Sequence, residues 1–357
     1  MNPYRRLCLL ALTAAASPAQ AAAPAVQRGR TLRFPQDHGA HLAARTEWWY
    51  ATGWLGTPAA PSQGFQVTFF RSRTGLAQGN TSRFAARHLL FAHAAVTHLG
   101  ATPRHEHDQR IVRWNGDAAA VLARSAEDRG EVVIGPWRLA DEGPHWRAQV
   151  AARSFSLDLR LARTQPMLLQ GAEGFSRKGP DEHQASHYYS EVQLAVQSSA
   201  PSGSQSGRAW LDHEWSGEIL HPQAVGWDWI GINLFDGSAL TAFVLRRRDG
   251  TALWAGGSFR AAGGAAQAFG PEQVRMSPGR RWSSPATGTA YPVEWAVATP
   301  AGRHTVRALA DAQELDSRGS TGAVYWEGLS ELLDSQGQRI GLGYLEMTGY
   351  AAPLALR

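Results

Sequence analysis

Hydrophobic and polar residues alternate over short stretches of this chain, and long amphipathic helical patterns are nearly absent. Residues 154–161 show the alternation most clearly, because polar residues separate Phe155, Leu157 and Leu159. A period of two is typical of strands with one buried face. The same reasoning predicts strands over residues 46–54, 64–73, 88–99, 111–114 and 132–139, and one short helix over residues 118–126. The pattern predicts an all-β protein whose sheets close into barrels, since closure removes exposed strand edges.

Turn residues divide the predicted strands. Asp236 and Gly237 separate one pair of β-rich runs, and Asp249 and Gly250 separate the next, which is a strong hairpin signal. By composition, residues 198–207 form either a linker or the tip of a long hairpin. The remaining expectations are a loop over residues 104–110, a loop within residues 166–190 that ends in a strand beginning ASHYYS, and two closing strands over residues 323–334 and 339–350.

The two halves of the chain contain a similar pattern. The run WYATGWL, a turn and GFQVTFFRSR resembles WIGINLF, a turn and ALTAFVLRRR. In this match Trp49 and Trp229 are 180 residues apart. We therefore expect two β-rich halves of similar plan.

The first residues have the features of a secretory signal peptide. Arg5 and Arg6 precede an apolar run over residues 7–16 and a small-residue site that ends at Ala21. The apolar run is too short to span a membrane. We expect a signal peptide over residues 1–21 and a mature protein that is periplasmic or secreted, and soluble. The only cysteine, Cys8, lies within this segment, so the mature chain has no disulfide and no thiol chemistry.

The charge of the chain does not indicate a nucleic-acid partner. The formal net charge is +5, and 5 less the two signal arginines leaves +3. This excess is dispersed, with residues 246–248 as its densest cluster. A nucleic-acid-binding protein would show a basic stripe or a known reader module.

The mid-chain stretch AWLDHEWSGEILHPQAVGWDWIG, residues 209–231, contains the densest candidate chemistry. It combines four tryptophans with histidines and carboxylates, a mixture suited to a ligand pocket with apolar walls and a few polar groups. Strand alternation places His213 and Trp215 on one face and Asp212 and Glu214 on the other. By the same rule, Asp228 lies on the opposite face of its strand from Trp227 and Trp229. The pattern alone leaves open which face lines a pocket.

Several motifs together resemble one known family. RTEWWYATGWL, GFQVTFFRSR, GFSRKGP, ASHYYS, AWLDHEWS, GWDWIGINL, YWEG and GYLEMTGY are similar, in this order, to the AttH and carotenoid 1,2-hydratase (CrtC-like) proteins. The resemblance implies two consecutive lipocalin-like (calycin) antiparallel β-barrels, over residues 31–215 and 216–357. It also implies that the serine-rich segment at residues 198–207 is a strand connection inside the first domain.

The resemblance implies two functions of different classes. One is an exported AttH-like protein that binds a hydrophobic, isoprenoid or lipid-like molecule and is associated with an ABC-type transporter. The other is a hydratase, isomerase or cyclase that protonates an alkene of an isoprenoid. We favour the first role, because an exported location is awkward for carotenoid synthesis.

Candidate residues follow from this chemistry. Asp228 is the first candidate acid, because desolvation between Trp227 and Trp229 would raise its pKa, and His213 is the candidate base. Further catalytic candidates are Glu47, Tyr189, Asp212 and Glu214. The expected ligand walls are Trp49, Trp215, Trp227, Trp229 and Tyr188. Each carboxylate has an alternative as a hydrogen-bonded structural group, and each tryptophan as part of a core.

No cofactor or metal is expected. His105 and His107 are two residues apart, a spacing that suits one face of a strand and adventitious Zn or Cu, but their polar surroundings indicate a loop tip. The chain contains no GxSxG elbow, phosphate loop or dinucleotide fingerprint.

Overall fold

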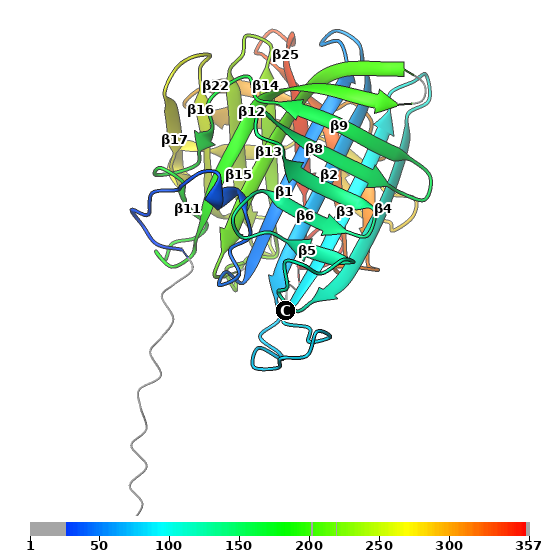
Figure 1. Cartoon of the computed structure of the whole chain (residues 1–357). Coiled ribbons are helices and arrows are strands. Elements are labelled where there is room, and N and C mark those ends of the chain that lie inside the picture. Colours follow the sequence, from blue (N-terminus) through cyan, green and yellow to red (C-terminus); the bar gives the residue numbers. More distant parts are fainter. Residues whose placement is uncertain (1–25, 201–202, 219, 355–357) are drawn as a thin grey trace, which may run out of the picture.

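The computed structural model describes residues 26–200, 203–218 and 220–354. The predicted signal peptide, residues 1–21, lies outside this part of the chain. Within the described residues, no helix is both long and apolar enough to cross a membrane. Antiparallel strands are the main elements of the molecule (Figure 1), and the described residues form no α-helix, so the predicted all-β class is confirmed.

The first sheet contains 13 strands and follows the order β4-β3-β2-β1-β13-β12-β9-β8-β7-β6-β5, with β10 and β11 beside β12. It rolls into a nearly closed barrel, because β4 lies against β5 and β6. Its strands are β1 Thr46–Gly56, β2 Pro61–Arg73, β3 His88–His98, β4 Arg104–Trp114, β5 Ala123–Ser125, β6 Glu131–Ile134, β7 Trp137–Asp141, β8 His145–Ala151, β9 Ser156–Ala162, β10 Leu168–Leu169, β11 Phe175–Arg177, β12 Ala185–Ala200 and β13 Gly203–Ser216.

The second sheet contains 10 strands in the order β17-β16-β15-β14-β25-β24-β22-β21-β18, with β23 beside β24. Its strands are β14 Gly226–Leu234, β15 Ala239–Arg246, β16 Ala252–Arg260, β17 Ala266–Phe269, β18 Arg275–Pro278, β21 Glu294–Thr299, β22 Gly302–Ala308, β23 Glu314–Ser317, β24 Ala323–Leu333 and β25 Arg339–Met347. The small pair β19 Arg281–Ser283 and β20 Ala290–Pro292 and the 3-10 turns η1 Gln36–His38 and η2 Pro271–Gln273 complete the described structure.

Two local expectations are wrong, and residues 132–139 contribute to two paired strands, β6 and β7, where one strand was expected. Residues 118–126 form turns and strand β5 in place of a helix, because Ala123 to Ser125 pair with β6. Residues 104–110 belong to β4 and do not form a loop, since β3 offers pairing along its full length, from His88–Trp114 to His98–Arg104. At residues 118–126 and 104–110, pairing with a neighbouring strand outweighs the local preference of the sequence for a helix or a loop. The hairpin alternative for residues 198–207 is confirmed, because β12 and β13 pair up to Ala200 and Gly203.

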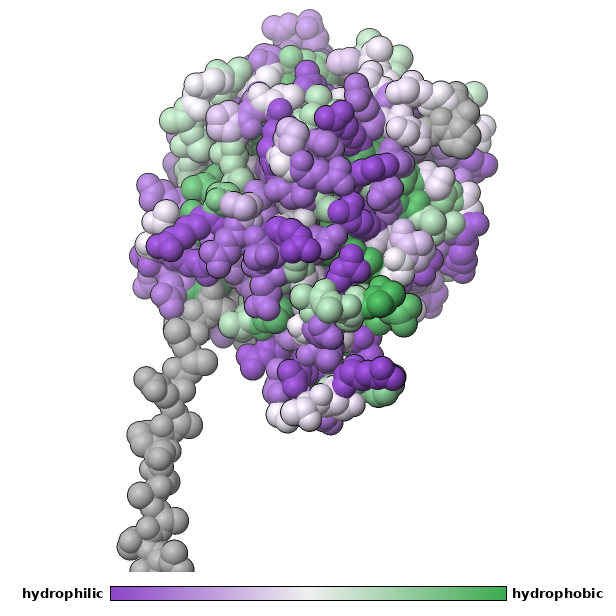
Figure 2. Space-filling model, in the orientation of Figure 1, coloured by the Kyte–Doolittle hydropathy of each residue, from purple (hydrophilic) through white to green (hydrophobic). Residues whose placement is uncertain are grey.

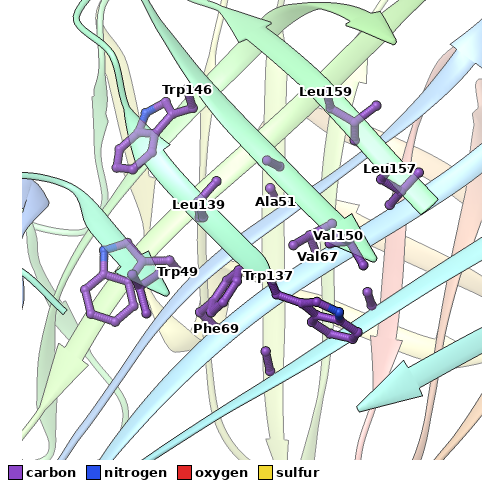
Figure 3. Packing of buried hydrophobic residues seen from close by; sticks show 14 of the residues in the cluster. Trp49, Ala51, Val67, Phe69, Trp137, Leu139, Trp146, Val150, Leu157 and Leu159 are labelled. Carbon is purple, nitrogen blue, oxygen red and sulfur yellow. The ribbon is translucent and has the colours of Figure 1, made fainter. Parts of the chain in front are cut away.

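The first barrel is filled by side chains. Trp49, Phe69, Trp137 and Trp146 pack together with aliphatic residues of the other strands of this sheet (Figure 3), and these four side chains are almost fully buried. These large buried rings form a close-packed hydrophobic core inside the first barrel.

The two barrels pack against each other through β1, β2 and β13 on one side and β14, β24 and β25 on the other. Each of these strands therefore has one face in its own barrel and one in the interface. Gly64 permits the approach of β2, because a Cβ there would lie 2.9 Å from Leu329 and from the Tyr344 hydroxyl.

The similar segments in the two halves occupy equivalent positions, since β1 and β14 each pair with the last strand of their own sheet. Their tryptophans differ, however. Trp49 belongs to the core of the first barrel, whereas Trp229 belongs to the cluster between the barrels. A match that aligns these two residues thus joins opposite strand faces.

Candidate functional site

A cavity of about 370 Å³ lies between the two barrels. Strands β1, β2, β3, β12 and β13 of the first sheet and β14, β15, β24 and β25 of the second contribute to its walls. The aromatic side chains along it are Trp48, Tyr50, Phe70, Phe91, Tyr188, Trp227, Trp229, Phe243 and Tyr325. Its size and lining are those of a small-molecule site.

Strand alternation decides which residues reach this cavity. On β13, Asp212 and Glu214 line it, while His213 and Trp215 point into the first barrel. On β14, Trp227 and Trp229 line it, and the intervening Asp228 points the other way.

Buried carboxyl groups lie among these aromatic rings. Burial raises the pKa of Asp212 to about 7, although hydrogen bonds from Ser190 and Trp210 oppose the shift. Glu327 and Glu346 face each other in the register of β24 and β25. Burial and the neighbouring Glu346 raise the pKa of Glu327 well above its usual range, and burial raises the pKa of Glu346 to about 7. These three groups can hold a proton near neutral pH.

Some polar atoms in the cavity wall lack a well-aligned partner. Among the described residues, the Tyr50 hydroxyl, Glu214 Oε1 and Glu327 Oε1 are buried without a hydrogen bond of good geometry. Buried polar groups are normally satisfied. Lys178 lies near Glu214 Oε1, and Tyr50 and Glu327 interact with each other, so these contacts leave bonding capacity for a polar group of a molecule in the cavity.

Lys178 is the only lysine among 35 basic residues, and it lines this cavity. Its Nζ lies 3.0 Å from Glu214 Oε1. The ammonium also lies 4.7 Å from the centre of the Tyr188 ring and 4.4 Å from that of Phe243. Aromatic faces attract a cation, so this charge is held where the cavity walls of the two barrels meet.

A second polar cluster, the barrel network, lies inside the first barrel. Glu47 accepts hydrogen bonds from Arg71 at 2.8 Å, from His213 at 3.0 Å and from the His41 ring at 2.8 Å. Burial would raise the pKa of Glu47, but the Arg71 charge and the two imidazoles outweigh it and hold the pKa well below its usual range. Burial lowers the pKa of His213. Tyr189 contacts the other ring nitrogen of His213 at 3.2 Å.

Asp228 lies in the second barrel, where Arg246 approaches it at 2.7 Å and the Tyr350 hydroxyl donates a hydrogen bond at 3.0 Å. Burial raises the pKa of Asp228 to about 6 despite the Arg246 charge. Asp228 does not line the cavity between the barrels.

The structure thus separates the candidates that the sequence placed side by side. Asp212, Glu214, Tyr188, Trp227 and Trp229 share the cavity. His213, Tyr189, Trp49 and Trp215 lie within the first barrel, and Glu47 touches the cavity edge while its carboxylate belongs to the barrel network.

The sequence reasoning missed most of the other residues that line the cavity, among them the polar residues Tyr50, Lys178, Glu327 and Glu346. All four lie in quoted runs, namely RTEWWYATGWL, GFSRKGP, YWEG and GYLEMTGY. Lys178 could have been singled out because it is the only lysine of the chain.

Among the described residues, one group of three side chains has the spacing of a metal site: His41, Glu47 and His213. The carboxylate in it is already bonded to Arg71, whose positive charge disfavours a cation. His105 and His107 lie on β4 and bond Thr97 and the backbone of Asp316.

These observations define a class of protein: two lipocalin-like β-barrels in one chain, with a largely apolar cavity between them. The AttH-like family model matches residues 25–350, and the chain belongs to this family.

Solved structures agree with this assignment. A Nitrosomonas europaea protein assigned as an AttH is 44% identical, with a TM-score of 0.82, over 92% of this chain and 99% of that one. Kievitone hydratase from Nectria haematococca is 12% identical, with a TM-score of 0.63, over 90% of this chain and 94% of its own. The latter likeness shows the fold alone. No match to a curated protein was found.

Proposed function

We propose that this protein binds an uncharged hydrophobic molecule, isoprenoid or lipid-like, in the cavity between its barrels. The observation that carries the proposal is the aromatic wall of the cavity together with the buried carboxyl groups that lie in it. Nonpolar walls favour a hydrophobic ligand. Asp212, Glu214, Glu327 and Glu346 disfavour an anionic one, whereas a hydroxyl or carbonyl group could bond to them.

The proposed setting is the cell envelope. The predicted signal peptide supports export, and the family resemblance supports service to an ABC-type transporter. In this role the protein would carry its ligand without changing it.

Binding can be tested with two probes of similar chain length. Geranylgeraniol is an uncharged isoprenoid alcohol, and hexadecanoate is an anion. Quenching of tryptophan fluorescence should give tighter binding of the alcohol at pH 8, and native mass spectrometry of detergent-free protein should show a co-purified ligand. Absence of any ligand, together with no binding of either probe, would contradict the proposal.

The raised carboxyl pKa values favour a second candidate function, the addition of water to an alkene. A protonated carboxyl group would donate its proton to one alkene carbon and leave a cation on the other. Nearby aromatic faces would stabilise that cation. Water would then form the C–O bond and release a proton to an ionised carboxylate, so that the net change is the addition of one water molecule.

Glu327 is the best-placed acid for this step, with Glu346 or Asp212 as the acceptor of the second proton. This assignment moves the acid from Asp228 to the cavity wall. Glu327→Gln distinguishes the two functions, because a carrier should keep its affinity for geranylgeraniol while a hydratase should lose about 100-fold or more of its turnover.

A further inference from the structure

One end of the first barrel exposes large nonpolar side chains. Seven such residues are exposed in the described part of the chain, and five of them lie at this end. They are Leu76, Phe84, Ile111, Val121 and Leu122, with exposed fractions from 42% to 86%. Single exposed hydrophobic residues are ordinary, but a cluster of this kind marks an interaction site.

The topology explains the clustering. Strand β2 ends at Arg73 and β3 begins at His88, so residues 74–87 connect them. His88 pairs with Trp114, the last residue of β4, and the following segment to β5 therefore leaves from the same end. Residues 74–87 project from the lower edge of the molecule in Figure 1, and Figure 2 shows hydrophobic residues gathered beside the base of this projection.

Positive charge lies beside Leu76, Phe84 and Ile111, while the segment that carries Val121 and Leu122 contains one acidic residue, Asp117. Residues 73–87 contain three arginines, Arg73, Arg83 and Arg87, and no acidic residue. Arg83 and Arg113 lie 4.9 and 5.8 Å from the centre of the Phe84 ring. None of these four arginines takes part in an ion pair with a described residue. Their charges are therefore available to a negatively charged partner.

This end also adjoins the cavity. Ser72 and Leu89, at the base of the projection, and the exposed Ile111 all line it. The deep walls, such as Tyr188 and Tyr50, are buried. The exposed lining residues place an opening of the cavity beside the projecting segment.

We propose that this end of the molecule docks on an anionic phospholipid membrane. Leu76, Phe84, Val121 and Leu122 enter the interfacial region, and Arg73, Arg83, Arg87 and Arg113 contact the phosphate groups. Nonpolar side chains with arginines beside them complement an anionic bilayer, which is apolar inside and negative at its surface. Docking would bring the cavity opening to the bilayer, so that a hydrophobic molecule passes between them without crossing water.

The experiment is sedimentation of the purified mature protein with vesicles, compared between two compositions. One contains equal parts phosphatidylglycerol and phosphatidylcholine, and the other contains phosphatidylcholine alone. We expect binding to the anionic vesicles only, weakening as salt is raised. Arg83→Gln combined with Arg87→Gln should weaken binding to the anionic vesicles roughly 25-fold, since each charge near an anionic surface contributes about fivefold.

Leu76→Ser combined with Phe84→Ser should weaken binding by a similar factor, and both residues are exposed enough for the fold to survive. Matched controls lie elsewhere: Phe235→Ser in the turn after β14, and Arg275→Gln combined with Arg303→Gln on the second barrel. Both controls should bind as the wild type does.

Equal binding to the two vesicle types, no binding to either, or loss of binding in the control variants would overturn the proposal. So would self-association that the Leu76 and Phe84 substitutions abolish, since the cluster would then be an interface between two copies. The docking surface is independent of the cavity contents. Trp227→Ala should therefore weaken geranylgeraniol binding and leave vesicle binding unchanged, which separates this inference from the proposed function.

Discussion

The barrel network and Asp212 lie on opposite faces of the first sheet, yet the charges of their carboxyl groups are compensated differently. In the barrel network, Glu47 is bonded to a guanidinium and two imidazoles, and its pKa is lowered. Across the sheet, Asp212 has a hydroxyl and an indole as partners but no cation, and its pKa is raised.

This difference separates structural polar groups from functional ones. A buried charge with complete bonding stabilises one arrangement and has nothing left to offer a ligand. A buried carboxyl beside an open cavity keeps a proton and a free lone pair. The same residue types can therefore have different roles on the two faces of one sheet.

The largest effect is expected from breaking the barrel network. Arg71→Met would leave Glu47 buried without its counter-charge, so the free energy of unfolding should fall by about 3 to 5 kcal/mol. Urea unfolding would measure this. Adding Glu47→Gln should restore a large part of the loss, and a fall below about 1 kcal/mol in the single variant would show that the ion pair is not needed to hold the charge.

Replacing a carboxyl group of the cavity should raise the free energy of unfolding, whereas replacing Arg71 should lower it. Because burial raises the pKa of Asp212 to about 7 from 3.8, the folded state holds a proton that the unfolded chain releases. The contribution of this group to stability therefore falls as pH rises between about 4 and 7. Asp212→Asn removes this titration. The free energy of unfolding of the variant, compared with that of the wild type, should therefore rise by about 1 to 3 kcal/mol from pH 5 to pH 8.

Urea unfolding at both pH values provides the test. Asp128→Asn serves as the control, because its side chain is exposed and should show no pH-dependent difference. A parallel pH dependence in wild type and Asp212→Asn would show that Asp212 is ionised as usual.

Ligand affinity should depend on the residues that line the cavity and not on those of the barrel cores. Trp227→Ala removes a wall of the cavity and should weaken geranylgeraniol binding about tenfold or more. Trp282 is also partly buried but packs on the core of the second barrel, so Trp282→Ala should leave the affinity unchanged. Titration calorimetry of both variants compares them directly, and equal losses would place the ligand elsewhere.

The smallest effect concerns Lys178. Reductive methylation modifies amines, and this side chain is the only lysine of the chain. Bound geranylgeraniol should slow its modification several-fold, because the ammonium lies in the cavity wall. Mass spectrometry would follow the added methyl groups, with the α-amino group as the internal control. Unchanged rates at saturating alcohol would mean that the ligand does not reach the Lys178 end of the cavity.

Much of the fold could be predicted from the sequence. Alternation located most strands, Asp-Gly pairs located two hairpin turns, and the motif order indicated two barrels. The errors at residues 104–110 and 118–126 share one cause, since pairing with a distant strand overrode local polarity and helical propensity.

The sequence by itself determined that Asp212 and Glu214 face away from His213 and Trp215, because a strand has a period of two. Only the tertiary structure decided that the carboxyl face meets the second barrel and that the imidazole face meets the core of the first. That decision depends on long-range partners, such as Arg71 for Glu47 and Glu346 for Glu327. These partners lie on other strands, and only the packing of the two barrels determines which group stays charged, which keeps a proton and which reaches a ligand.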